Sequence, residues 1–198
     1  MRFPYNSFAL IASNLMQTHS GHFTWSHKIS GPDQTIYDLA VKTGQNLAAH
    51  GWMLVTAESC TGGWTGQAIT TIPGSSAWYE RGFITYSNAS KHEMLGVRQT
   101  TLDQYGAVSP QTATEMAAGA LNRSRAHISV AITGIAGPDG GTAGKPVGMV
   151  CFGWMHRNGL ARQETHYFHG NREAIRGQAV IIALQGILNL IDETPLTA

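Results

Sequence analysis

The sequence contains little cysteine and little charge. Two of its 198 residues are cysteines, Cys60 and Cys151, too few for the disulfide framework of a small secreted protein. We therefore expect two reduced thiols in a cytoplasmic protein. Charged residues make up 13% of the chain and the formal net charge is +1. This balance gives no reason to expect binding to nucleic acid or to a membrane surface.

Long apolar runs and targeting signals are also missing. No run approaches the roughly 18 apolar residues of a membrane-spanning helix, and the first residues lack the cleavage site of a signal peptide. Residues 1–34 show no clear periodicity and are interpreted as an irregular arm or extension. Their histidines, His19, His22 and His27, have no cysteine or nearby carboxylate to complete a zinc site. We predict neither a metal nor a cofactor.

The remaining chain, residues 35–198, alternates between strand and helix patterns and is predicted to be one domain. Strands alternating with helices predict an α/β three-layer sandwich, with helices on both faces of a mostly parallel sheet. The last two predicted strands meet at Arg157–Gly159 and would form an antiparallel hairpin, which makes the sheet mixed. The expected strands are residues 52–57, 80–87, 127–133, 147–156 and 161–169.

Helix-start and helix-stop residues support this reading. Ser109 before Pro110 is a typical N-cap followed by proline at the first helical position. Asn171 is the expected cap of the closing helix, and Gly51 ends the first one. The expected helices are residues 36–50, 62–72, 89–97, 108–121 and 171–191.

Three loops with reactive or glycine-rich composition each follow a predicted strand directly. They are residues 58–63 (ESCTGG), 87–91 (SNASK) and 134–141 (GIAGPDGG). Because ligands bind beyond the carboxyl ends of parallel strands, we expect the three loops to meet at one edge of the sheet. The glycine loop matches neither the P-loop nor the dinucleotide fingerprint, but its N–H groups could bind an anion.

The first of these loops offers three possible nucleophiles, Ser59, Cys60 and Thr61. Lys91 lies on the expected edge and could act as a base if its pKa fell from about 10.4 toward 7–8; His92 is the competing base. A Ser–Lys pair is a known variant of the serine-nucleophile design.

Each of these residues has a plainer reading from its pattern alone. Ser59, or better Thr61, could cap the following helix. Lys91 could be a solvated surface lysine, and Tyr86 a core or interface side chain.

Several uncommon strings together resemble one family. Residues 56–97, GAVS at 106–109, SVAITGIAGPDGG at 129–141 and KPVGMVCFG at 145–153 are similar to the motifs of the nicotinamide-nucleotide amidohydrolases, in the same order. That family also forms the C-terminal domain of the competence/damage-inducible protein CinA. The resemblance covers about residues 35–190. In one departure, GMVC stands where GTVW is common.

The resemblance implies a hydrolase that deamidates nicotinamide mononucleotide (NMN) to nicotinate mononucleotide and ammonia, in pyridine nucleotide salvage. It places the nucleophile at Ser59, the base at Lys91, and a positioning or proton-relaying tyrosine at Tyr86. The oxyanion would be held by N–H groups at the start of the 62–72 helix. Glu58 or Asp139 would face the cationic ring, or else serve as a capping or turn residue. The oxyanion-hole and substrate-binding set is predicted to be Cys60, Thr61, Gly62, Gly63, Asn88, Thr133, Gly134, Ala136 and Gly137.

Other functions fit the same sequence. The chain could be a catalytically silent nucleotide-binding paralogue, or an amidase for another small carboxamide. A partner subunit in DNA competence or repair ranks last, because the chain has no basic run. We also expect a homo-oligomer, with Trp52 and Trp78 as apolar surface residues available to an interface.

Overall fold

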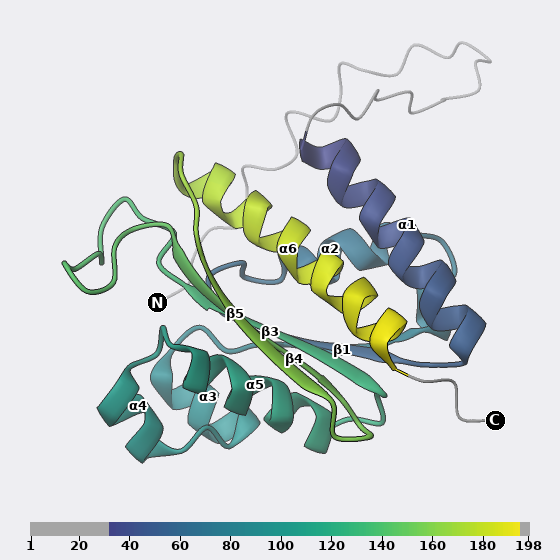
Figure 1. Cartoon of the computed structure of the whole chain (residues 1–198), viewed down its shortest axis with the longest axis horizontal. Coiled ribbons are helices and arrows are strands. Elements are labelled where there is room, and N and C mark those ends of the chain that lie inside the picture. Colours follow the sequence, from purple (N-terminus) through teal and green to yellow (C-terminus); the bar gives the residue numbers. More distant parts are fainter. Residues whose placement is uncertain (1–31, 195–198) are drawn as a thin grey trace, which may run out of the picture.

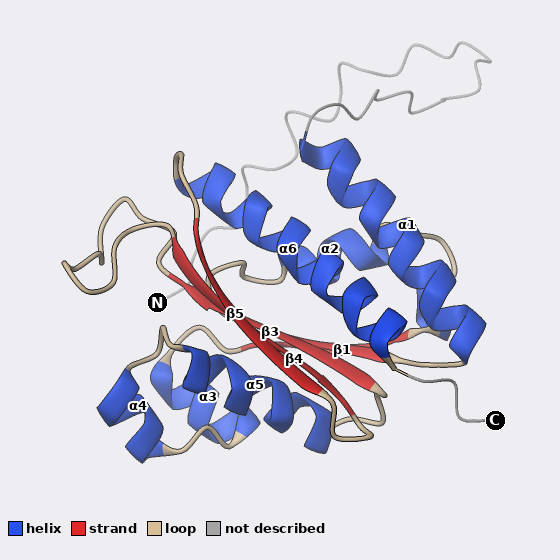
Figure 2. Cartoon of the chain, viewed as in Figure 1, coloured by secondary structure: helices blue, strands red, loops and turns tan. Residues whose placement is uncertain are grey.

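The computed structural model describes residues 32–194 as a five-stranded sheet between two layers of helices (Figures 1 and 2). This confirms the predicted three-layer α/β fold. Predictions that concern residues 1–31, including the three histidines, lie outside the described residues. The strands are β1 (Leu54–Glu58), β2 (Tyr79–Ile84), β3 (Ile128–Gly134), β4 (Met149–His156) and β5 (Ala161–Tyr167). The helices are α1 (Pro32–His50), α2 (Trp64–Thr70), η1 (Ser75–Ala77), α3 (Asn88–Leu95), α4 (Gln99–Tyr105), α5 (Pro110–Asn122) and α6 (Arg172–Glu193).

The sheet is mixed, with strand order β2-β1-β3-β4-β5. Strand β1 pairs in parallel with both β2 and β3, and helices connect these strands because a parallel crossover needs a long connection. Strands β4 and β5 run antiparallel, so the predicted hairpin is confirmed. Three carboxyl ends therefore open on the same edge, as the sequence predicts.

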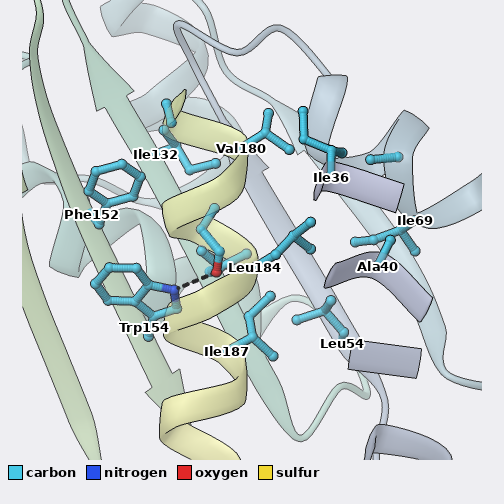
Figure 3. Packing of buried hydrophobic residues seen from close by; sticks show 14 of the residues in the cluster. Ile36, Ala40, Leu54, Ile69, Ile132, Phe152, Trp154, Val180, Leu184 and Ile187 are labelled. Carbon is cyan, nitrogen blue, oxygen red and sulfur yellow. Dashed lines mark hydrogen bonds between the residues drawn. The ribbon is translucent and has the colours of Figure 1, made fainter. Parts of the chain in front are cut away.

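Helices cover both faces of the sheet. Helices α1, α2 and α6 lie on one face, and α3, α4 and α5 on the other (Figure 1). Strand β1 is buried along its whole length, as expected of a central parallel strand that is covered on both faces. In the larger core, the indole of Trp154 packs against α6 and donates a hydrogen bond to Ala183 O at 3.0 Å (Figure 3).

Helix α6 is, within residues 32–194, the one helix long and apolar enough to cross a membrane. Its most apolar stretch is 56% buried, and its apolar side chains belong to the core cluster shared with α1 and the sheet. The structure therefore accounts for its apolar character as that of a core helix.

The predicted caps of α5 and α6 are confirmed. Ser109 Oγ accepts a hydrogen bond from Thr112 N–H at 3.2 Å, with Pro110 in the first turn of α5. Asn171 Oδ1 accepts from Ala174 N–H at 2.9 Å at the start of α6. Helix α1 begins at Pro32, three residues before the domain boundary that we predicted at residue 35.

Two expectations about this part of the chain were wrong. Helix α4 was not predicted, because Leu102 is its only buried apolar residue and threonines weaken its helical pattern. Contacts to α5 stabilise α4, since Thr101 Oγ1 donates to Glu115 at 2.7 Å. Trp78 is 5% exposed and belongs to the core, so it is not available to an interface. Trp52 is half-buried and packs against the same core.

Gly119 of α5 allows α3 to approach closely. A Cβ at this position would lie 2.0 Å from the carbonyl oxygen of Leu95, the last residue of α3. We expect Gly119→Ala to lower the free energy of unfolding by about 1–3 kcal/mol or more, because the two backbones must separate. Urea denaturation measures this. The control is Gly144→Ala, where an added Cβ meets nothing within 4 Å; equal stability of the two variants would contradict the prediction.

Candidate active site

The first two predicted loops leave the sheet side by side at the carboxyl ends of β1 and β2. Thr85 N–H donates to Glu58 O at 2.8 Å, and Ser59 N–H donates to Ile132 O at 2.9 Å. These bonds extend the parallel ladders by one residue and fix Ser59 between β2 and β3. The backbone of the nucleophile loop is therefore held by the sheet on both sides.

Lys91 reaches Ser59 from the start of α3. Ser87 caps this helix through a reciprocal pair of bonds with Ser90, which sets Lys91 in the first turns. Lys91 Nζ donates to Ser59 Oγ at 3.0 Å and to Thr85 O at 2.8 Å. Ser59 is 8% exposed and Lys91 only 1%, so Lys91 is not a solvated surface residue. The structure thus brings together the two residues that the sequence placed on different loops.

Burial changes the acidity of Lys91. Desolvation of the ammonium group lowers its pKa from 10.5 to about 8. Its hydrogen bonds within residues 32–194 end on two oxygens without formal charge, those of Ser59 and Thr85. A lysine with this pKa is partly neutral near physiological pH and can accept a proton from the Ser59 hydroxyl. The competing base His92 instead contacts Val97 O at 2.9 Å.

The neighbouring candidates are poorly placed for nucleophilic attack. Burial raises the pKa of the Cys60 thiol to about 12, so that almost no thiolate forms at neutral pH. Thr61 is fully buried, and its hydroxyl has no hydrogen-bond partner in the described part of the chain. Of the three possible nucleophiles, Ser59 alone contacts a base.

Glu58 caps helix α2, contrary to the sequence expectation for Ser59 or Thr61. Its buried carboxylate accepts hydrogen bonds from Gly63 N–H at 3.0 Å, Thr65 N–H at 3.1 Å and Gly66 N–H at 2.9 Å. A carboxylate at a helix N-terminus also complements the helix dipole. Glu58 therefore has the second of its two predicted roles, that of a capping residue.

The same bonds change the prediction for the oxyanion. Gly63 N–H is used by Glu58, and Gly62 N–H donates to Ser59 O at 3.1 Å. The start of α2 is therefore occupied, and these two glycines do not supply free donors. Instead, their positive φ angles, 62° and 96°, let the chain turn into the helix, which favours glycine. Within residues 32–194, neither Cys60 N–H nor Thr61 N–H donates to another residue.

Tyr86 lies at the exposed rim of the site. Its side chain is 64% exposed, and its hydroxyl accepts a hydrogen bond from Arg172 Nη2 at 3.1 Å. Arg172 Nη1 donates to Gly137 O at 2.8 Å, so this arginine joins Tyr86 to the glycine loop. No hydrogen bond links Tyr86 to Ser59 or Lys91 among the described residues. Its predicted proton relay stays a prediction.

The other predicted binding residues lie on the two neighbouring loops. Asn88 is exposed at the start of α3, and Asp139 is exposed in the glycine loop. Thr133 is buried and its hydroxyl donates to Ala107 O at 2.8 Å, which makes it a bridge to the loop before α5. Gly134 is the last residue of β3, and Ala136 is buried.

Two arginines at the start of α6 were missed by the sequence analysis. Arg172 contacts Tyr86 and Gly137 as described above. Arg176 Nε donates to Cys60 O at 3.0 Å, and its Nη2 to Thr61 O at 2.7 Å. Both lie on a segment that we interpreted only as a capped helix. Their spacing of four residues puts both side chains on one helix face, and this spacing was the sequence feature that could have identified them as a pair.

Comparison with known proteins places this geometry in context. The CinA C-terminal domain family model matches residues 36–191. A nicotinamide-nucleotide amidohydrolase, PncC, from Enterobacter agglomerans is 52% identical over 156 residues, which cover 79% of this chain and 95% of that protein. PncC from Pseudomonas putida is 47% identical over 155 residues, covering 78% of this chain and 96% of its own length. The crystal structure of the competence/damage inducible protein CihA from Agrobacterium tumefaciens aligns with a TM-score of 0.77 at 48% identity, covering 79% of this chain and 95% of that chain.

Proposed function

Because this chain belongs to the CinA C-terminal domain family, we propose that it is an enzyme, a nicotinamide-nucleotide amidohydrolase. It would hydrolyse the carboxamide of NMN to give nicotinate mononucleotide and ammonia. Relatives with this name match nearly their whole length at 47–52% identity. The observation that carries the mechanism is the 3.0 Å contact between Ser59 Oγ and the buried Lys91 Nζ.

In the first step, neutral Lys91 accepts the proton of the Ser59 hydroxyl while Ser59 Oγ attacks the carboxamide carbon. The C–O bond forms and the carbonyl π electrons move onto oxygen. Cys60 N–H and Thr61 N–H, which donate to no other residue in the described chain, would bind this oxyanion. One such donor is worth about 2.7–4 kcal/mol of barrier.

In the second step, the Lys91 ammonium returns its proton to the amide nitrogen. The C–N bond then breaks, ammonia leaves and an ester to Ser59 remains. Lys91, neutral again, takes a proton from water as the water attacks this ester. The collapse of that intermediate releases nicotinate mononucleotide and returns the proton to Ser59. The 2.8 Å bond to Thr85 O keeps the amine in position throughout the cycle.

The rim supplies groups suited to the rest of the substrate. Arg172 points a guanidinium toward Tyr86 and the glycine loop, and a guanidinium binds phosphate well. The exposed ring of Tyr86 is available to the cationic pyridinium through a cation–π contact. N–H groups in the glycine loop after Ile135, whose own N–H donates to Met149 O, would contact the ribose or the phosphate.

The test is ammonia release by the purified chain from NMN, nicotinamide riboside and nicotinamide. We expect NMN to be hydrolysed and the two compounds without phosphate to be turned over at least about 100-fold less efficiently, because the guanidinium of Arg172 would then have no phosphate to bind. Equal rates on all three would indicate an amidase for another carboxamide. If none of the three compounds releases ammonia although NMN still binds, the chain is a silent paralogue.

A further inference from the structure

The orientation of a backbone N–H is fixed by the carbonyl of the same peptide unit. A trans peptide is planar, so its C=O and N–H point in opposite directions. Any group that holds the carbonyl therefore also aims the N–H. This matters for Cys60 and Thr61, whose N–H groups have no acceptor in another residue among residues 32–194.

The two peptides are held in different ways. The peptide that carries Cys60 N–H has the carbonyl of Ser59, which accepts from Gly62 N–H at 3.1 Å. That bond lies within the loop itself. The peptide that carries Thr61 N–H has the carbonyl of Cys60, which accepts from Arg176 Nε at 3.0 Å. This second bond comes from α6, which lies 116 residues further along the chain.

Arg176 is itself rigidly placed. Its second nitrogen donates to Thr61 O at 2.7 Å, so one guanidinium holds two successive carbonyls. The guanidinium also lies over the ring of Trp64, 5.3 Å from the centroid. Its neighbour Ile175 is buried in the core. The planar guanidinium presents its donors at a fixed angle to the two carbonyls, whereas the donors of a lysine ammonium rotate on a flexible stem.

We propose that Arg176 is a positioning residue that aims Thr61 N–H at the oxyanion formed on attack by Ser59. This inference rests on the proposed function. Arg176 acts through the Cys60–Thr61 peptide and does not touch the substrate. Its positive charge also polarises that peptide and makes its N–H a stronger donor. The oxyanion exists only after attack, so the effect belongs to kcat and not to substrate binding.

The experiment compares kcat and KM for NMN in Arg176→Gln, Arg176→Lys and a control, Gln178→Ala. Gln178 lies on the same helix, with its side chain bonded to His169 O and Ala174 O. We expect Arg176→Gln to lower kcat about 10–100-fold with KM changed less than about 3-fold, because a misaimed donor loses most of its effect. Arg176→Lys should recover part of kcat, and added guanidinium ion should raise the kcat of Arg176→Gln. Gln178→Ala should match the unaltered chain.

Several results would overturn the inference. One is a kcat for Arg176→Gln within about 3-fold of the unaltered chain, because loss of an oxyanion donor should lower kcat by more than this. Another is a large rise in KM at constant kcat, which would make Arg176 a substrate-binding residue. Unfolding of both variants in circular dichroism would make its role structural. If the unaltered chain and Gln178→Ala both release no ammonia, the proposed function fails and this inference fails with it.

Discussion

Replacing Ser59 with alanine will abolish ammonia release from NMN, with a fall in kcat of at least about 10⁴-fold. Among residues 32–194, the Ser59 oxygen is the one nucleophile that is hydrogen-bonded to the Lys91 amine, and its loss removes the covalent route. Binding of NMN, measured by calorimetry, should persist, because the rim residues Arg172 and Tyr86 are untouched. The rate is followed as ammonia released by the purified variant.

The matched control for this variant is Cys60→Ser. The Cys60 thiol is buried and its pKa is raised to about 12, so it supplies no nucleophile. We expect this variant to keep much of the rate. An inactive Cys60→Ser together with an active Ser59→Ala would show that the nucleophile has been assigned to the wrong residue.

Lys91→Met will produce an inactive protein that is more stable than the unaltered chain at pH 7. Burial lowers the pKa of Lys91 from 10.5 to about 8, which means that the folded state disfavours the charged form. A difference of this size costs about 3 kcal/mol of stability at low pH. Methionine fills a similar volume without charge, but Thr85 O then loses a donor, at about 1 kcal/mol. We expect a net gain of about 1–2 kcal/mol in urea denaturation at pH 7.

The pH dependence of this gain has a definite sign. Below pH 8, the lysine is charged in both the folded and unfolded states, and the full cost of burial is present. Between pH 8 and 10.5, the folded protein is neutral at Lys91 while the unfolded chain still binds a proton, so the cost falls. The stability advantage of Lys91→Met over the unaltered chain should therefore be largest below pH 8. It should fall to zero before pH 10.5 and then reverse sign, because only the hydrogen bond lost at Thr85 O remains. In the same range, kcat of the unaltered chain should rise with pH to a plateau above about 8.

Lys42→Met is the control, because Lys42 is exposed on α1. It should change stability by less than about 0.5 kcal/mol. A Lys91→Met variant that is less stable than the unaltered chain at pH 7 would show that the hydrogen bonds of Lys91 outweigh its burial.

Much of the fold could be predicted because local signals and tertiary packing agree. The strand pattern at Leu54–Glu58, the cap at Ser109 and the cap at Asn171 each reflect interactions within a few residues. Helix α4 could not be predicted, since its stability comes from contacts with α5 and not from its own periodicity. Trp78 was placed on the surface for a related reason: the sequence cannot show which face of a loop the core will cover.

The site was predictable in part. Ser59 and Lys91 were candidates because their loops were expected at the same edge of the sheet. The family resemblance then favoured them over Cys60, Thr61 and His92. The sequence allowed Glu58 either to face the cationic ring or to cap a helix. Its three hydrogen bonds from N–H groups at the start of α2 show that it caps the helix. Arg176 could not be assigned from the sequence, because its contact with Cys60 spans 116 positions and depends on how α6 lies across the sheet.

The acidity of one buried amine also sets how much of the enzyme is ready to react. With a pKa of about 8 for Lys91, roughly one molecule in ten has this amine deprotonated at pH 7, and about half at pH 8. Turnover at neutral pH would then represent a small reactive fraction of the protein. A modest alkaline drift in the surroundings would increase flux several-fold without any change in the amount of enzyme.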